Sequence, residues 1–457
     1  MNIRLQPVSP PKTDALLTPI NLTNETLLHR KQNLMTAMRE QHVDSVIIYA
    51  DREHGDNFEY FTGFVPRFEE ALLIVHQSGK AYVLLGNENM KMAAYSRIDV
   101  EAIHVPFFSL PNQPMKDDTR LEDYFQAADI STGKKVGVIG WKLFTSTSYQ
   151  NQYLFDLPYY LIDTLKHLEI ELFNFSAVLI SPEKGIRTVN DANEIAHFEY
   201  GAALAGRSLL DALDHIDLGK TEIEIAGLLA SGGQPQTVTT ICATGDRFTD
   251  AVVYPRNKAI QLGDKMSLTI GFKGGLSSRS AYAVSTASEL PVKEQDYVAK
   301  VVTPYFRALA TWLQTIQIGI SGDFLYQNIQ TVLPQEDFHW ELNPGHFTAT
   351  EEWLASPFYP GSTCTVKSGQ IFQIDIIPSV AGFAGVSAEE GIAIADKDLR
   401  IEIQKDYPLV WERIMRRRNY LKKELGIELS EEILPMSDTL AYYRPYLLDK
   451  TAAMVFK

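Results

Sequence analysis

One histidine and three acidic residues in the last quarter of the chain are spaced so that they could form a reaction centre. His346 follows a Pro-Gly turn, and Asp375 lies inside the apolar run IFQIDII. Glu389 and Glu390 directly precede a second apolar run. Because a carboxylate within an apolar strand is costly to bury without a partner, two such strands side by side would bring Asp375 to Glu389, with His346 as a third member. A histidine with two carboxylates can hold a metal ion or transfer protons. The alternative, in which Asp375 faces solvent and His346 caps a loop, stays open.

The elements that would position these residues follow a repeated order in the second half of the chain. Apolar spacing predicts helices and strands in the order helix, helix, strands, helix, helix, strands. The expected helices are 187–216, 221–229, 293–316 and 322–332, and the expected strands between them are 237–244, 265–272 and 280–286. Thr221 with Glu224 is typical of a helix N-terminus. This order predicts two related halves that face each other across a cleft.

The first part of the chain has a different pattern. Residues 26–41 have helical spacing, and short apolar runs at 46–50 and 136–139 are typical of buried strands. Two further runs, 71–75 and 81–85, flank a Ser-Gly turn and predict a hairpin. We therefore expect an arm over residues 1–25 that is extended or poorly ordered, an α/β domain over 26–180 and a second domain over 181–457.

Composition limits the classes of function. The chain has 457 residues, of which 45% are hydrophobic and 22% charged, as in soluble globular proteins of two domains. A net charge of −15 argues against a nucleic acid or an anionic membrane as the main partner. No apolar run approaches the roughly 20 residues that span a bilayer, and no signal peptide is evident. With only Cys242 and Cys364, both interpreted as structural, these features predict a cytoplasmic protein.

A basic segment near the C-terminal end, RIMRRRNYLKKEL, is the one stretch that could indicate nucleic-acid binding. We expect 399–425 to be a helix. Because the chain as a whole is acidic, the preferred interpretation of these cations is a solvated helix face paired with local acids.

Several motifs in order along the chain resemble one family, the pita-bread hydrolases: prolidase, aminopeptidase P, methionine aminopeptidase and creatinase. The motifs are NFEYFTGF, RTVNDANEIAHFEYGAALAG, KTEIEIAGLL, LGDKMSLTIGF, PGHF, GQIFQIDIIP and SAEEGIAIAD. The resemblance covers nearly the whole chain. It implies a mixed α/β (α+β) fold, with a creatinase-like N-terminal domain and a pita-bread catalytic domain built from two related ααβ halves.

The resemblance also implies a place for each metal ligand, and this chain departs from the pattern. The metallopeptidases hold two metal ions with two Asp, one His and two Glu. Thr269 stands where the first Asp is expected, and Ser278, Arg279 or Ser280 where the second is expected, depending on a one-residue gap. No Asp lies between Asp264 and Asp296.

The other family positions are partly retained. His346 and Glu389 match the family His and final Glu, and Asp375 stands in place of a Glu. A second family His would fall near Trp353, and another near 252–254, where this chain has none. Two divalent cations close together need bridging carboxylates to offset their repulsion, so the sequence predicts that a two-metal site is lost.

Three functions follow as alternatives. The first is a metal-independent, creatinase-like hydrolase of a C–N bond in a small amide or amidine, with His346 as general base and Asp375 and Glu389 as substrate anchors or as groups that orient the imidazole. No cofactor is expected for it. The second is an Xaa-Pro aminopeptidase or prolidase-type metallopeptidase, with Mn or Zn on His346, Asp375 and Glu389. The third is a catalytically inactive binding protein of this fold.

Four further residues are candidates for substrate binding. Arg279 could replace the charge of a lost metal and pair with Asp375 or Glu389; in the inactive alternative the same pairs would lock the two halves together. Glu390 neighbours Glu389. Arg67 follows the N-terminal motif, in a loop that reaches the partner subunit's site in the creatinase branch. Tyr254 could supply a hydroxyl where the family has a His. The resemblance also implies a homodimer, which the N-terminal arm could strap, and a small-molecule substrate.

Overall fold

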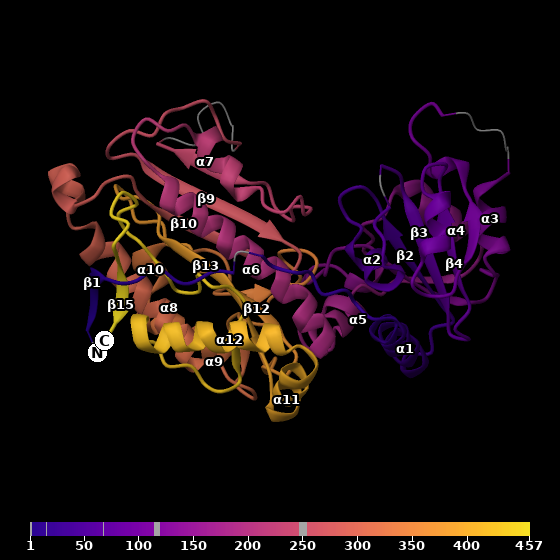
Figure 1. The fold of residues 1–457 in the computed structure, drawn as a ribbon. Coiled ribbons are helices and arrows are strands. Elements are labelled where there is room, and N and C mark those ends of the chain that lie inside the picture. The colour runs from indigo at the N-terminus through magenta and orange to yellow at the C-terminus, as the bar shows by residue number, and fades with distance from the viewer. Residues whose placement is uncertain (1, 15, 67, 114–118, 246–253) are drawn as a thin grey trace. The chain divides into compact units, whose positions relative to one another are not determined.

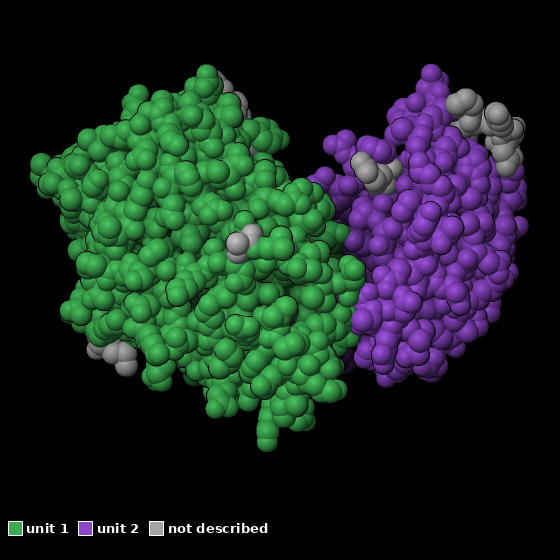
Figure 2. Space-filling model, in the orientation of Figure 1, with its two compact units in different colours: residues 1–21, 188–457 green, residues 22–187 purple. Residues whose placement is uncertain are grey.

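The computed structural model describes residues 2–14, 16–66, 68–113, 119–245 and 254–457. The chain forms two compact units (Figure 2). Unit 1 comprises Met1–Asn21 with Thr188–Lys457, and unit 2 comprises Leu22–Arg187. The boundary between these compact units lies at 187/188, and the first 21 residues belong to the unit formed by the second half of the chain.

Unit 2 is built on a mixed sheet. Its strand order is β5-β4-β3-β2-β6-β7 among the described residues, with β3 antiparallel to its neighbours β2 and β4 and the other pairs parallel. The strands are β2 (Ser45–Ala50), β3 (Ala71–His76), β4 (Ala81–Leu85), β5 (Glu101–His104), β6 (Lys135–Ile139) and β7 (Glu171–Asn174). The helices are α1 (Asn24–Glu40), α2 (Asp56–Thr62), α3 (Leu121–Ala127), α4 (Tyr159–His167) and α5 (Ala177–Ile180), with short 3-10 turns η1 (Met90–Tyr95), η2 (Pro106–Phe108) and η3 (Asn151–Tyr153).

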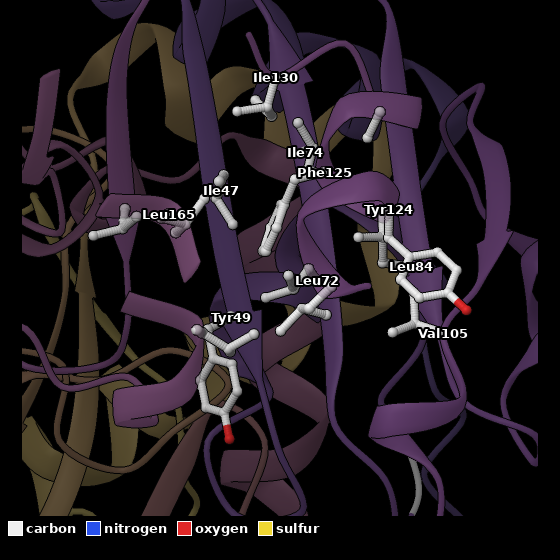
Figure 3. Packing of buried hydrophobic residues seen from close by; sticks show 14 of the residues in the cluster. Ile47, Tyr49, Leu72, Ile74, Leu84, Val105, Tyr124, Phe125, Ile130 and Leu165 are labelled. Atoms are coloured by element: carbon white, nitrogen blue, oxygen red, sulfur yellow. The ribbon is translucent and has the colours of Figure 1, made fainter. Parts of the chain in front are cut away.

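The core of unit 2 forms where α3 and α4 pack on this sheet (Figure 3). Ile47 and Tyr49 on β2, Ile74 on β3, and Phe125 on α3 are buried within it. Side chains two residues apart on a strand point to the same face, so Ile47 and Tyr49 both reach this core. The predicted hairpin of β3 and β4 is confirmed, with Ala71 paired to Leu85 and Val75 to Ala81.

Unit 1 is built on an antiparallel sheet with the order β11-β12-β13-β10-β9-β8 in the described part of the chain, and β14 also pairs with β13. These strands are β8 (Ile241–Thr244), β9 (Lys265–Phe272), β10 (Gly275–Tyr282), β11 (His346–Phe347), β12 (Ile371–Ile374), β13 (Ser387–Ile394) and β14 (Ile433–Pro435). A separate pair joins β1 (Ile3–Pro7) to β15 (Ala452–Phe456).

The first four long helices of unit 1 come in the order that the sequence predicts, whereas the single helix expected over 399–425 is divided at Tyr407, before Pro408. The α-helices of unit 1 are α6 (Ala192–His215), α7 (Glu222–Leu229), α8 (Thr303–Thr315), α9 (Gly322–Val332), α10 (Gln335–Phe338), α11 (Lys397–Asp406) and α12 (Pro408–Tyr420), with the short turns η4 (Ile186–Thr188, across the unit boundary), η6 (Ala287–Glu289) and η7 (Val292–Glu294) and the π-helical turns η8 (Val298–Val302) and η9 (Leu421–Leu425). Reciprocal capping boxes start two of them: Asp191 with Glu194 for α6, and Thr221 with Glu224 for α7. Each box satisfies backbone N–H groups that a helix leaves without partners at its first turn.

Helix α6 packs closely on one face of the sheet, against β9 and β10 (Figure 1). Gly201 of α6 lies so near the β9–β10 turn that a Cβ at this position would overlap the carbonyl oxygen of Lys273. Gly201→Ala should therefore force the helix and the turn apart and lower the free energy of unfolding by about 1–3 kcal/mol.

The matched control for this substitution is Gly227→Ala in α7. A Cβ at Gly227 would meet no heavy atom within 4 Å. This change should leave stability unaltered or raise it by up to ~1 kcal/mol, because alanine favours helix more than glycine does. Chemical denaturation of both variants measures the difference; equal midpoints would contradict the packing argument.

The described residues of the N-terminal arm contact the C-terminal part of the same chain. Strand β1 pairs antiparallel with β15, which brings Ile3 opposite Phe456 and places the two termini together (Figure 1). Farther along, the Tyr420 hydroxyl donates to the carbonyl of Ser9 at 2.8 Å, and Nη1 of Arg416 contacts Asp14 at 2.9 Å. Of the two expectations for the arm, extended or poorly ordered, residues 3–7 follow the first. Strand pairing and an ion pair compensate for the entropy of ordering the arm.

Cations of the basic segment pair with acids as expected, but two arginines of α12 are buried and not solvated, which corrects that part of the sequence interpretation. Arg413 and Arg417 turn inward and share the carboxylate of Glu199 on α6, which is fully buried. Arg417 also donates to Asp438 at 2.9 Å. A guanidinium presents several donors in a fixed plane, so each arginine can join more than one buried acceptor.

No helix in the part of the chain that the structure describes is both long enough and apolar enough to cross a bilayer.

Candidate active site

The face of the unit 1 sheet opposite α6 carries a row of polar side chains across three strands. Ser278 on β10 lies directly between Thr269 on β9 and Glu389 on β13 in the sheet register. The hydroxyls of Thr269 and Ser278 are hydrogen-bonded to each other at 2.9 Å. All three residues are largely buried. Of the three candidates for the second Asp position, Ser278 is therefore the one beside Glu389.

A second row on the same face brings in the histidine. His346 on β11 pairs with Gln373 on β12, and Gln373 pairs with Gly391 on β13. Because Gly391 and Glu389 are two residues apart on one strand, His346 and Glu389 share a face. Asp375 follows the end of β12, and its Oδ2 lies 3.9 Å from Nε2 of His346. The structure thus brings His346, Asp375 and Glu389 together.

A third carboxylate, from Glu352, completes the cluster. Its Oε1 lies 3.0 Å from Nε2 of His346, at a position where the ring N–H and the carboxylate are not aligned for a hydrogen bond. The Nδ1 atom of His346 lies 3.0 Å from the carbonyl of Phe347. A carbonyl only accepts, so Nδ1 carries a proton, and Nε2 is the atom that faces the acids. The indole of Trp353 stacks on the imidazole at 4.2 Å and fixes the plane of the ring.

Burial and mutual repulsion shift the titration of the cluster. Burial raises the pKa of the Asp375 carboxyl to about 6, with His346 opposing the rise and Glu352 adding to it. Burial also raises the pKa of Glu389 well above its usual range, and the charges of Asp375 and Glu352 add to this rise. Burial alone would lower the pKa of His346, but its contacts with Glu352 and the charge of Asp375 outweigh burial and raise it. Acids held close together in a buried site resist joint ionisation.

These shifts predict how stability depends on pH. A carboxyl whose pKa is higher in the folded than in the unfolded state stabilises the fold below the unfolded value, and that contribution is lost as pH rises through the folded value. For Asp375 the loss falls between about pH 4 and pH 6 and amounts to roughly 3 kcal/mol. Asp375→Asn should therefore be more stable than the parent chain at pH 8 and similar to it at pH 4.

Thermal unfolding of both proteins between pH 4 and pH 8, in buffer with a chelator, measures this difference. The control is Asp337→Asn on α10, an exposed acid that should change neither curve. Parallel curves for Asp375→Asn and the parent chain would show that Asp375 titrates normally.

Arg279 and Glu390 are not brought to this site, and the expected pairing of Arg279 with Asp375 or Glu389 is wrong. Arg279 is 1% exposed and points to the α6 side of the sheet, where Nη2 donates to Oε1 of Glu390 at 3.0 Å. It also donates to the backbone carbonyls of Tyr442 and Thr439. The reason is the pleat, since Ser278 and Arg279 are adjacent on one strand and must face opposite sides.

The two remaining candidates lie elsewhere. Arg67 is outside the described residues. Tyr254 is 64% exposed on the connection between β8 and β9, so its role as a hydroxyl donor stays a prediction. Both cysteines are buried and free, and burial raises the pKa of Cys242 to about 12, which leaves its thiol protonated.

Comparison with known proteins is consistent with this architecture. Residues 30–141 match the family model of the creatinase/prolidase N-terminal domain. No curated protein sequence matches the chain. Similar solved structures are a prolidase from Pyrococcus horikoshii OT3 (18% identity, TM-score 0.60, 80% of this chain and 95% of that one) and a recombinant prolidase from Thermococcus sibiricus (17%, 0.63, 82% and 96%). An X-Pro aminopeptidase from Thermotoga maritima MSB8 is also similar (16%, 0.61, 80% and 95%).

The chain has the pita-bread fold.

Within this fold, the two-metal centre that the resemblance implies does not fit the residues present. Thr269 and Ser278, the residues of β9 and β10 that lie in the row with Glu389, bond to each other and carry no charge. The ligand atoms that are present suit one metal ion better than two. His346, Glu352 and Glu389 each offer one ligand atom, and the three atoms lie within 4.8 Å of one another. A single imidazole with carboxylates is a ligand set that one divalent ion accepts.

Glu352 and Gln373 are the residues that sequence reasoning missed. The resemblance implies a second His near Trp353, and it implies no role for the adjacent Glu352. The signal was the pair Glu351-Glu352 a few residues after His346 in an otherwise apolar and small-residue stretch. Gln373 was hidden within an apolar run. Its amide donates to the carbonyl of Leu276 at 2.7 Å, and it lies beside His346 on the site face.

Proposed function

We propose that unit 1 is a hydrolase that cleaves an amide-type C–N bond in a small substrate. The observation that carries the proposal is the convergence of His346 with three carboxylates, from Glu352, Asp375 and Glu389, on one face of a pita-bread sheet. Similar structures are named for prolidase and X-Pro aminopeptidase activity, which favours X-Pro peptides as the first substrates to test.

The cluster has the groups that such a reaction needs. Nε2 of His346 and Oδ1 of Asp375 are buried and have no hydrogen bond among the described residues, so both can bind a water molecule or a substrate polar group. Glu352 is the one member that is partly exposed, at 21%, and so lies on the side from which substrate would enter. Proton transfer among closely spaced groups with raised pKa values is suited to general acid–base catalysis near neutral pH.

A second candidate is metal-independent, creatinase-like hydrolysis of a small amide or amidine, with His346 as the general base. The specific observation that favours it is the hydrogen-bonded Thr269–Ser278 pair at the positions where a metal centre would need carboxylates. In this form Nε2 takes a proton from water, Phe347 holds the ring through Nδ1, and Asp375 and Glu389 anchor the substrate or stabilise the imidazolium. The rate should then rise with pH as His346 loses its proton.

One substrate panel separates the candidates. The full chain is assayed against Xaa-Pro dipeptides and small amides and amidines, once with a chelator and once with added Mn²⁺ or Zn²⁺. Turnover of an Xaa-Pro peptide only with metal supports the peptidase, in which the bound ion would supply Lewis acidity to water or the carbonyl. Turnover that a chelator leaves unchanged supports the second candidate. No turnover in either condition would overturn both and favour an inactive binding protein. The homodimer stays a prediction, which analytical ultracentrifugation of the same preparation measures.

A further inference from the structure

The site gathers three carboxylates around one imidazole, and no arginine or lysine among the described residues forms an ion pair with them. His346, Glu352 and Glu389 supply three ligand atoms that lie within 4.8 Å of one another. Each comes from a different element: the start of β11, the loop that follows it, and β13. Arg279, on the strand next to Glu389, turns to the other face of the sheet and pairs with Glu390. Buried acids in such a cluster must either keep their protons or be offset by a cation.

The buried carboxylate of Asp375 independently indicates a cation at the same place. It is 4% exposed, and its Oδ1 has no hydrogen-bond partner in the part of the chain that is described. Its Oδ2 lies 3.9 Å from Nε2 of His346, so the carboxylate faces the cluster. A buried carboxylate oxygen without a donor is costly, and a bound ion or its water ligands would satisfy it.

His346 shares a feature with metal-binding histidines, a hydrogen bond from the ring nitrogen that does not face the site. Its Nδ1 donates to the carbonyl of Phe347 at 3.0 Å, which leaves Nε2 with a lone pair toward the carboxylates in the neutral ring. The stacked indole of Trp353 fixes the orientation of the imidazole. The ring is fully buried, so its direction is set before any ion arrives.

The neighbouring row adds no carboxylate beyond Glu389 itself. Thr269 and Ser278 complete the row that contains Glu389, but they hold each other through one hydrogen bond and offer neutral hydroxyls. A second divalent ion beside the first would need anionic ligands here to offset the repulsion between the two charges.

From these observations we propose that the site binds one divalent cation, with Glu352 as a ligand beside His346 and Glu389, and that Thr269 and Ser278 exclude a second ion. Glu352 comes from the loop after β11, so a carboxylate from that loop compensates in part for the carboxylates missing from β9 and β10. The role of this ion in turnover rests on the function proposed above, whereas its binding does not.

The first experiment measures binding without substrate. The full chain is stripped of metal and titrated with MnCl₂ or ZnCl₂ by calorimetry, and the bound metal is counted by mass spectrometry after equilibrium dialysis. We expect one equivalent and a higher melting temperature with metal. Glu352→Gln should weaken binding roughly 10-fold or more. The matched control is Glu351→Gln, which removes the adjacent carboxylate and should bind as the parent chain does. No saturable binding, or equal affinity for Glu352→Gln and the parent chain, would overturn the proposal.

The second experiment tests the limit of one ion. The double variant Thr269→Asp with Ser278→Asp places two carboxylates in the row beside Glu389. It should bind two equivalents where the parent chain binds one. A stoichiometry that stays at one would show that Thr269 and Ser278 do not set the number of ions. Metal binding without turnover would contradict the proposed function alone, and turnover without metal binding would contradict this inference alone.

Discussion

Glu199→Ala is expected to destabilise unit 1 by about 3–5 kcal/mol, the largest loss of stability for a single substitution that we predict. Glu199 is fully buried on α6, and its carboxylate accepts from both Arg413 and Arg417 of α12. Removing it leaves two guanidinium groups in the interior with one acid fewer. The ion pairs of Arg417 with Asp438 and of Arg416 with Asp14 and Asp438 remain in the variant. Only the contacts made by Glu199 itself are lost.

Differential scanning fluorimetry and urea denaturation measure this effect. The expected loss corresponds to a decrease of about 5–8 °C in melting temperature for a unit of this size. The control is Glu402→Ala on α11, an exposed helical acid whose removal should shift the melting temperature by less than about 1 °C. A triple variant with leucine at 199, 413 and 417 should recover part of the loss, because apolar groups of similar size can replace a buried ionic cluster. Equal melting temperatures for Glu199→Ala and Glu402→Ala would show that the network does not stabilise the fold.

His346→Asn is expected to lower kcat/KM by about 10²- to 10⁴-fold on whichever substrate the panel identifies. The imidazole contacts the three-carboxylate cluster through Nε2, and an asparagine amide cannot accept and release a proton there. The same loss follows whether His346 is a general base or a metal ligand. The two roles separate in the metal-binding measurement, because only a ligand changes the affinity for the ion.

The matched control is His339→Asn. His339 is exposed at the end of α10 and has a left-handed backbone with φ of 51°, which asparagine tolerates. It should keep the activity of the parent chain. Circular dichroism and melting curves confirm that both variants are folded before rates are compared. If the His346→Asn protein keeps more than about a tenth of the parent activity, His346 has no essential role in the reaction.

Local signals in the sequence are enough to predict much of unit 1. Helix α9 occupies the predicted range from Gly322 to Val332, and α7 begins after the predicted Thr221 cap. Both follow from interactions within a few residues: hydrophobic spacing of 3.6 and a side chain that caps its own helix. The apolar runs around Asp375 and Glu389 likewise form neighbouring strands.

The sequence could not decide which of two adjacent residues faces the site. Ser278 and Arg279 alternate across β10, and a shift of one residue in the register would exchange them. The turn between β9 and β10 fixes the register, with Thr269 opposite Ser278. That choice directs the only cation of the three candidate residues to Glu390, away from the acids of the site.

The order of the main elements and the acids and histidine that could react can be predicted from the sequence, because they depend on side-chain type and short-range periodicity. The contact of Glu352 with His346, the burial of Arg413 and Arg417, and the bond between Thr269 and Ser278 cannot be predicted in this way. Each of these depends on which loop or helix packs against a face of the sheet. Contacts between residues far apart in sequence are set by the packing of the whole unit, which no local pattern records.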